Sequence, residues 1–138
     1  AGTAFEGVNI WKRDGYYYLF ASIGSCCEGA NSTYSTVVGR SKSLTGPYMS
    51  KDGGYMLENA YTVVLSKNSA FVGVGHNSIL QKDDEENTWM LYHGYQVNKV
   101  DDGRLVLLDC VLWDDDRWPY VEGEGASLKS SYPVINKR

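Results

Sequence analysis

An internal repeat constrains the fold of this 138-residue chain more than any other feature of its sequence. The segment GYYYLFAS at 15–22 matches NTWMLYHG at 87–94 in its pattern, and TGPY at 45–48 matches RWPY at 117–120. Both pairs are offset by 72 residues (87 − 15 and 117 − 45). Upstream, NIWKRD at 9–14 parallels SILQKD at 78–83. Two similar sequence units predict two similar structural modules.

The local patterns predict that both modules are built from β-strands. The apolar runs are short and are bounded by Gly, Asp, Asn and Ser, which is typical of an all-β chain. An Asp-Gly pair at 14–15, between two strand-like runs, predicts a hairpin turn. We expect strands at 7–13, 16–23, 34–42 and 47–50 in the first unit, and at 76–82, 88–96, 104–113 and 119–122 in the second.

Repeated four-stranded units are the signature of β-propeller blades, which stack around a central channel. A propeller typically has at least four blades, so two blades cannot close the ring. The repeat therefore predicts that the missing blades come from a separate partner chain, or that this chain is the C-terminal piece of a longer protein. A self-contained eight-stranded sandwich is the alternative fold that the length permits.

Composition excludes several classes of partner. The formal net charge is −4 and the 13 basic residues are scattered, which argues against nucleic-acid binding through a basic face. No apolar run approaches the roughly 20 residues of a membrane helix, so no membrane partner is expected. The three cysteines are an odd number, and Cys26 and Cys27 are adjacent, so the spacing fits neither a zinc site nor a disulfide framework.

The repeat also locates two polar residues that could do chemistry. Aligning IWKRD at 10–14 with ILQKD at 79–83 places Glu6 opposite Gly75 and Gly7 opposite His76. Because the first strand of a propeller blade lines the central channel, we expect Glu6 and His76 to face one shared cavity. The alternatives are a solvated glutamate and a buried, hydrogen-bonded histidine. His93, in the middle of a strand, is expected to be a core histidine of that second kind.

Three segments resemble the C-terminal part of the arabinan-degrading enzymes of glycoside hydrolase family 43. They are FEGVNIWKRDGYYYLFAS, CCEGANSTYSTVVGRSKSLTGPY, and GVGHNSIL with TWMLYHGY. The chain resembles an endo-1,5-α-L-arabinanase or a close relative. The resemblance implies a five-bladed β-propeller of which this chain is blade 4 (1–50), a connection (51–75), and blade 5 with a tail (76–138), completed by an N-terminal segment.

The same resemblance implies an activity and roles for individual residues. Family members hydrolyse α-1,5-linked arabinan with inversion, using a Glu general acid, an Asp base and a second Asp that tunes the acid. Glu6 matches the acid, although Val8 stands where the family usually has Pro. His76 matches a channel histidine that helps to hold a hydrated metal, often calcium. The segment that borders the substrate cleft corresponds to Asn31, Ser32 and Tyr34.

Neither of the two family aspartates has a counterpart here, so we expect both to belong to earlier blades. The resemblance also implies a secreted, periplasmic or cell-surface protein of a bacterium. Three other functions are open: a different family 43 activity (arabinofuranosidase or xylosidase), a non-catalytic carbohydrate-binding module, and a sialidase-like propeller. A sialidase needs clustered arginines, whereas the five arginines here are dispersed along the sequence.

Overall fold

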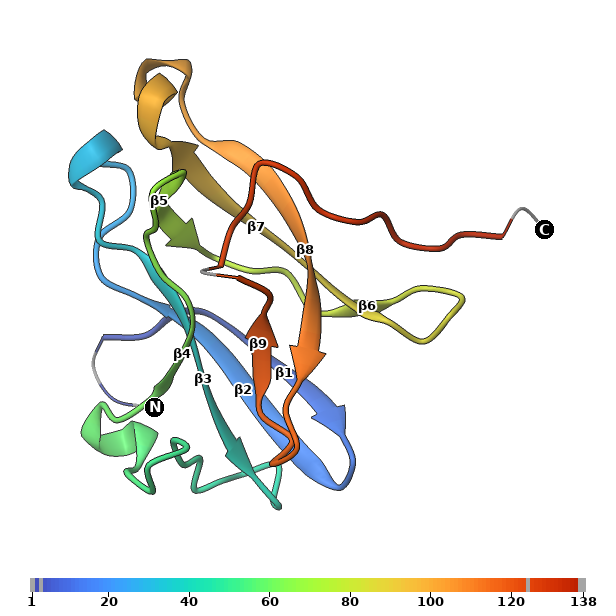
Figure 1. Ribbon diagram of the computed structural model, residues 1–138. Coiled ribbons are helices and arrows are strands. Elements are labelled where there is room, and N and C mark those ends of the chain that lie inside the picture. The colour runs from blue at the N-terminus through green and yellow to red at the C-terminus, as the bar shows by residue number, and fades with distance from the viewer. Residues whose placement is uncertain (1, 3, 124, 137–138) are drawn as a thin grey trace.

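The computed structural model describes residues 2, 4–123 and 125–136, which form two antiparallel β-sheets (Figure 1). The first sheet has the strand order β1 (Glu6–Arg13), β2 (Tyr16–Ile23), β3 (Ser35–Ser41), β4 (Thr62–Leu65). The second has the order β5 (Phe71–Gly75), β7 (Thr88–Gln96), β8 (Leu105–Trp113), β9 (Pro119–Val121), and β6 (Gln81–Lys82) also pairs with β7. Short 3₁₀ helices are η1 (Gly29–Asn31), η2 (Met56–Glu58) and η3 (Val97–Asp102). The predicted all-β class is confirmed.

The hairpin of β1 and β2 forms where the sequence predicts it. Arg13 pairs with Tyr16, and the two residues between them, Asp14 and Gly15, both have positive φ values of 49° and 79°. Such a two-residue loop matches the right-handed twist of the strands, and Asp-Gly is among its preferred sequences.

The predicted fourth strand of the first unit, at 47–50, is wrong. Met49 forms only isolated bridges, with Arg40 and with Tyr55, and β4 takes the place beside β3. The physical reason is burial: β4 puts Val64 and Leu65 into the core between the sheets, whereas 47–50 belongs to a loop that covers the outer face of β3. The strand therefore lies inside the stretch that was expected to be a connection.

Of the predicted strand at 76–82, only Gln81–Lys82 is a strand. β5 ends at Gly75, and pairing with β7 resumes at β6. The repeat alignment itself is confirmed by the backbone: Gly7 and His76, which it places opposite each other, both have a φ of 55°. At the same point β1 has a register shift between Glu6 and Asn9. Both inner strands thus carry an irregularity at matching positions.

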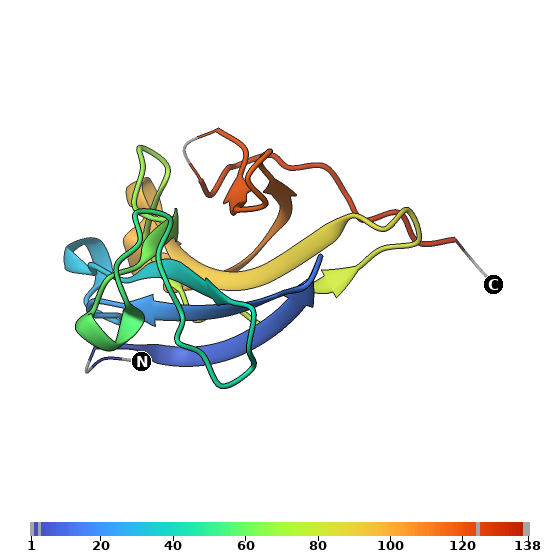
Figure 2. The same ribbon diagram turned by 90° about the horizontal axis from the view of Figure 1, so that it is seen from below.

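The two sheets pack face to face, as Figure 2 shows from below. Their shared core contains Tyr18 and Phe20 from β2 with Met90 and Tyr92 from β7, all buried. A smaller cluster covers the other face of the first sheet, where Met56 packs over the bare backbone of Gly39. Two curved sheets stacked in this way are what two neighbouring propeller blades require.

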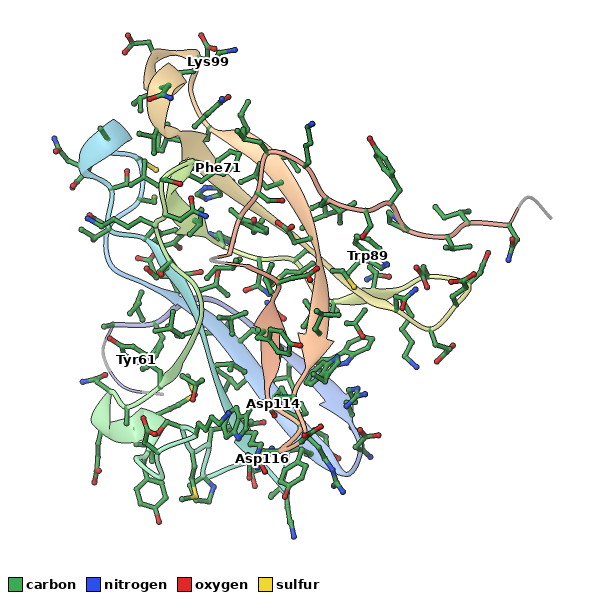
Figure 3. All side chains as sticks on the ribbon, viewed as in Figure 1. Tyr61, Phe71, Trp89, Lys99, Asp114 and Asp116 are labelled. Atoms are coloured by element: carbon green, nitrogen blue, oxygen red, sulfur yellow. The ribbon has the colours of Figure 1, made fainter. Side chains whose placement is uncertain are left out.

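The C-terminal segment crosses the outer face of the second sheet, near Trp89 in Figure 3. The Val134 amide donates to the Asp83 carboxylate at 3.1 Å, and the Asp84 amide donates to the Val134 carbonyl at 2.9 Å. Trp89 lines an apolar hollow together with Pro133 and Ile135. In the described part of the chain, no helix has the length and apolar character needed to cross a membrane.

Candidate active site

Glu6 lies at the first position of β1, opposite Ser22 of β2. Its side chain is exposed, and one carboxylate oxygen, Oε2, accepts a hydrogen bond of 3.0 Å from the hydroxyl of Tyr34. Alternation along β1 points Glu6, Val8 and Ile10 away from the core between the sheets. The carboxylate is therefore both reachable from outside and held by a defined partner.

Tyr34 is fixed in a slot between the two sheets, with 1% of its surface exposed. Its ring lies over Gly75, where a Cβ atom would come within 2.3 Å of Tyr34 Cδ2. The ring also stacks in parallel on His93, with ring centroids 5.8 Å apart and an interplanar angle of 11°. Burial, with the bond to Glu6, raises the pKa of Tyr34 to about 12. The hydroxyl therefore stays protonated and acts as a donor at neutral pH.

Two histidines complete the group. His76 is exposed at the end of β5, and its ring covers Gly7, where a Cβ would be 3.1 Å from His76 Cδ2. Its amide donates to the Ser22 hydroxyl at 2.7 Å, which ties the two sheets together. The centroids of the His76 and His93 rings are 6.3 Å apart.

His93 was expected to be a hydrogen-bonded core histidine, and this is not what the structure shows. It is half-buried, and its Nδ1 atom is buried without a hydrogen-bond partner among the described residues. Burial lowers its pKa, and the positive charges of Arg104 and His76 act in the same direction. His93 is therefore neutral at pH 7. No sequence signal marks it, because only the pairing of β7 with β5 places it opposite Gly75.

A hollow opens beside these residues between the inner strands of the two sheets. Its lining includes His76 and His93, with Gly7 and Val8 from β1 and the exposed apolar side chain of Val106; the remaining lining residues are Asn9, Asn77, Ser78, Ile79, Leu91 and Tyr92. Glu6 itself is not part of the lining but directly precedes Gly7. His76 and Glu6 thus lie at one rim, linked through His93 and Tyr34.

The other residues that the sequence proposed for substrate contact lie in the loop between β2 and β3. Asn31 ends η1 and is exposed. Ser32 is 3% exposed, its Oγ accepts a 3.0 Å hydrogen bond from the Glu28 amide, and it packs against the backbone of Gly73. Asn31 is therefore accessible to a ligand, whereas Ser32 fixes the loop. Contact of either residue with substrate stays a prediction.

Metal-ligating side chains do not gather in the part of the chain that the structure describes. Within residues 2, 4–123 and 125–136, no group of three or more His, Cys, Asp or Glu side chains is arranged to hold a metal ion. His76 presents one imidazole to the hollow. A cation at this place would have to be held through water or by groups that this chain does not supply.

The aspartates that the structure describes lie in turns or loops, in η3, or, in the case of Asp109, in β8. Asp109 is buried and accepts a 2.6 Å hydrogen bond from the Tyr92 hydroxyl. Burial raises the pKa of Asp109, and the bond from Tyr92 partly offsets that rise. This carboxylate is part of the inter-sheet core, and the prediction that the catalytic base lies outside the chain stays a prediction.

Three arginines that are dispersed in sequence come together at the far end of the sheets, about 23 Å along β1 from Glu6 at 3.3 Å per residue. Asp114 and Asp116 mark this end in Figure 3, opposite the end that carries Lys99. The Arg40 guanidinium lies 4.4 Å from the Tyr16 ring centroid and 4.3 Å from that of Trp118, and it donates to the Asp116 carbonyl. The Arg13 guanidinium stacks over the Trp113 ring. The backbone carbonyl of Arg117 accepts a hydrogen bond from the Tyr18 hydroxyl. The side chains of Arg40 and Arg13 and the backbone of Arg117 thus join the two sheets.

Comparisons with known proteins identify the family to which the chain belongs. The model of the family described as glycosyl hydrolases family 43 matches residues 1–119. An extracellular exo-α-(1→5)-L-arabinofuranosidase of Cellvibrio japonicus is 39% identical over 123 residues, which are 88% of this chain and 35% of the relative. An extracellular endo-α-(1→5)-L-arabinanase of Bacillus subtilis is 37% identical over 118 residues, covering 86% of this chain and 34% of the relative.

Solved structures agree. An α-L-arabinanase of Cellvibrio cellulosa in complex with arabinohexaose superposes with a TM-score of 0.80 at 35% identity, covering 88% of this chain and 38% of that one. For an endo-arabinanase of Bacillus licheniformis the TM-score is 0.75 at 39% identity, with coverage of 85% and 38%. The chain thus spans about a third of the length of the relatives that it matches. It belongs to glycoside hydrolase family 43.

Proposed function

We propose that this chain is the part of an arabinan-hydrolysing enzyme that carries the general acid, Glu6. The observation behind the proposal is the placement of Glu6: an exposed carboxyl group at a strand head, held by Tyr34 at 3.0 Å beside a hollow between two blades. A general acid has to be within reach of the glycosidic oxygen and fixed in direction. The oxygen that Tyr34 does not occupy, Oε1, would carry the proton.

In an inverting hydrolysis, Glu6 protonates the leaving oxygen while a carboxylate on the opposite face of the sugar activates water. The two carboxyl groups are then about 6.5–9.5 Å apart. Since no described aspartate of this chain lines the hollow beside His76, the base and the aspartate that tunes the acid would come from a further segment. The activity therefore belongs to the assembled protein.

That further segment would be the N-terminal blades of a five-bladed propeller, on the same polypeptide or on a separate chain. The support is an apolar surface next to the candidate site. Val8 is 49% exposed, Ile79 57% and Val106 78%, and all three line the hollow beside His76. Soluble proteins rarely leave contiguous apolar area of this kind uncovered. We expect residues 1–138 expressed alone to lack arabinan hydrolysis and to self-associate.

For the remaining features, the relatives guide the proposal. Both of the relatives compared above are described as extracellular, which supports secretion. The solved complex with arabinohexaose supports an arabino-oligosaccharide as ligand. His76 would hold a hydrated cation such as calcium in the channel. In that case His76→Ala should lower the calcium content of the assembled protein, measured by elemental analysis, and an unchanged content would contradict this role.

The proposed acid is tested in the full-length protein that contains this chain. Replacement of Glu6 by Gln removes the proton and nearly preserves the shape, so hydrolysis of linear α-1,5-arabinan should fall by about a hundredfold or more. A matched control is Glu58→Gln, which changes an exposed glutamate on η2. The control should keep full activity. Comparable activity of the two variants would refute the assignment.

A second reading concerns the mode of cleavage. One relative acts as an exo-arabinofuranosidase and another as an endo-arabinanase, at nearly equal identity of 39% and 37%. Product analysis by chromatography separates them, since an exo enzyme releases short products from the chain end at once and an endo enzyme first shortens the polymer. A protein that binds arabinan without releasing any product would instead favour the non-catalytic binding module.

A further inference from the structure

The sequence places Tyr34 in a segment bordering the substrate cleft, but the structure gives this side chain a different environment. It is almost fully buried, so a sugar cannot rest on its ring in this arrangement. Its hydroxyl nevertheless reaches the surface group that matters most for the proposed function, the Glu6 carboxylate. Tyr34 therefore contacts the candidate acid from behind.

Several features hold the Tyr34 ring in place. Gly75 leaves the space that the ring fills, since a Cβ there would be 2.3 Å from one ring carbon and 2.7 Å from the next. His93 stacks in parallel on the ring. Gly75 does not serve the strand itself, because glycine weakens a strand interior. Gly75 and His93 together hold the Tyr34 ring in place.

A fixed donor has a direct consequence for the acid. A glutamate at the exposed head of a strand can rotate about three side-chain bonds, and ordering such a side chain costs conformational entropy. The Tyr34 hydroxyl donates to Oε2 and leaves Oε1 free for the proton, so it can select one rotamer of the acid. The bond becomes stronger as the proton leaves, because Glu6 then becomes charged. Reacting groups need this fixed orientation, because small misplacements cost large factors in rate.

We infer that Tyr34 is a positioning residue: buried against Gly75 and stacked on His93, it holds the Glu6 carboxyl group in the orientation for proton transfer. The inference rests on the proposed role of Glu6 as the acid. It assigns Tyr34 no contact with substrate. It also explains why the VGVGHN segment of the second unit has a glycine at 75, opposite the acid in the repeat.

The test compares Tyr34→Phe with Tyr48→Phe in the full-length protein. Each variant deletes one hydroxyl group from a buried tyrosine, and that of Tyr48 donates to the Leu44 carbonyl in a loop away from Glu6. On a linear α-1,5-arabino-oligosaccharide, Tyr34→Phe should lower kcat by about tenfold to a hundredfold, as expected for a lost bond to a carboxyl group that becomes charged in the transition state, with KM within about twofold. Tyr48→Phe should keep both constants.

Crystal structures of the wild type and of Tyr34→Phe supply a second readout. The Glu6 side chain should occupy one rotamer in the wild type and several, or a different one, in the variant. A raised KM with unchanged kcat would overturn the inference and make Tyr34 a substrate-binding residue. So would an unmoved Glu6 with full kcat. A wild type without activity would refute the proposed function instead, and the rotamers of Glu6 would still decide whether Tyr34 holds it.

Discussion

Replacing Gly75 by Ala tests whether the space at Gly75 is needed to position Tyr34, because the change adds only a methyl group. The φ of Gly75 is not in the left-handed region, so alanine meets no backbone penalty there. The added methyl would lie 2.3 Å from Tyr34 Cδ2, whereas an ordinary contact begins at about 3.4 Å. The ring must therefore move by about 1.1 Å. Overpacking of this kind costs about 1–3 kcal/mol of the free energy of unfolding.

A displacement of that size should also break the 3.0 Å bond from Tyr34 to Glu6 and lower kcat by about tenfold. The matched control is Gly39→Ala, whose methyl would lie 2.4 Å from the sulfur of Met56, a flexible side chain in a different cluster. Urea denaturation gives the stability of each variant, and initial rates on arabinan give the activity. Equal activity losses in the two variants, or an active Gly75→Ala, would refute the reasoning.

Two further predictions concern the parts of the fold around the site. Arg40→Ala should lower the free energy of unfolding by about 2 kcal/mol in urea denaturation, because the guanidinium lies against the rings of Tyr16 and Trp118. Arg40→Lys should restore little of this stability, since an ammonium group cannot stack on both rings, and full restoration would contradict the role of Arg40 in joining the sheets. Desolvation opposes ionisation of Asp83, but hydrogen bonds, first among them that from the Val134 amide, outweigh it and hold the pKa of Asp83 well below its usual value. The stabilisation is therefore present above about pH 3.9 and is lost as the pH falls further. NMR of the Val134 amide should show the C-terminal segment still docked at pH 4, and release at a higher pH would contradict this.

The parts of the fold with a local chemical signature could be predicted from the sequence. The Asp14–Gly15 turn fixes its hairpin through two positive φ values that these residue types tolerate. The repeat likewise placed Gly7 opposite His76, and the shared φ of 55° shows that the two inner strands bend at the same point. Such features depend on a few neighbouring residues, so they can be predicted without knowledge of tertiary contacts.

The parts that depend on distant contacts could not be predicted. The short run at β4 sits between Asn- and Gly-rich stretches, and it is a strand because Val64 and Leu65 fill the space between the sheets. Similarly, the resemblance placed Tyr34 at the border of the substrate cleft, but nothing local indicates that it is buried behind Glu6 or that His93 stacks on it. Their roles follow from the pairing of β5 with β7 and from the bare backbone of Gly75. Sequence reasoning located the candidate acid, Glu6, but not the contacts behind it.

The most direct test of the account is the dependence of Glu6→Gln on the leaving group. A general acid matters only when the departing oxygen needs a proton. In the full-length protein, the variant should lose about a hundredfold or more in kcat on an arabino-oligosaccharide, and far less on a nitrophenyl arabinofuranoside, whose leaving group departs without protonation. Equal losses on the two substrates would show that Glu6 does not act as the acid.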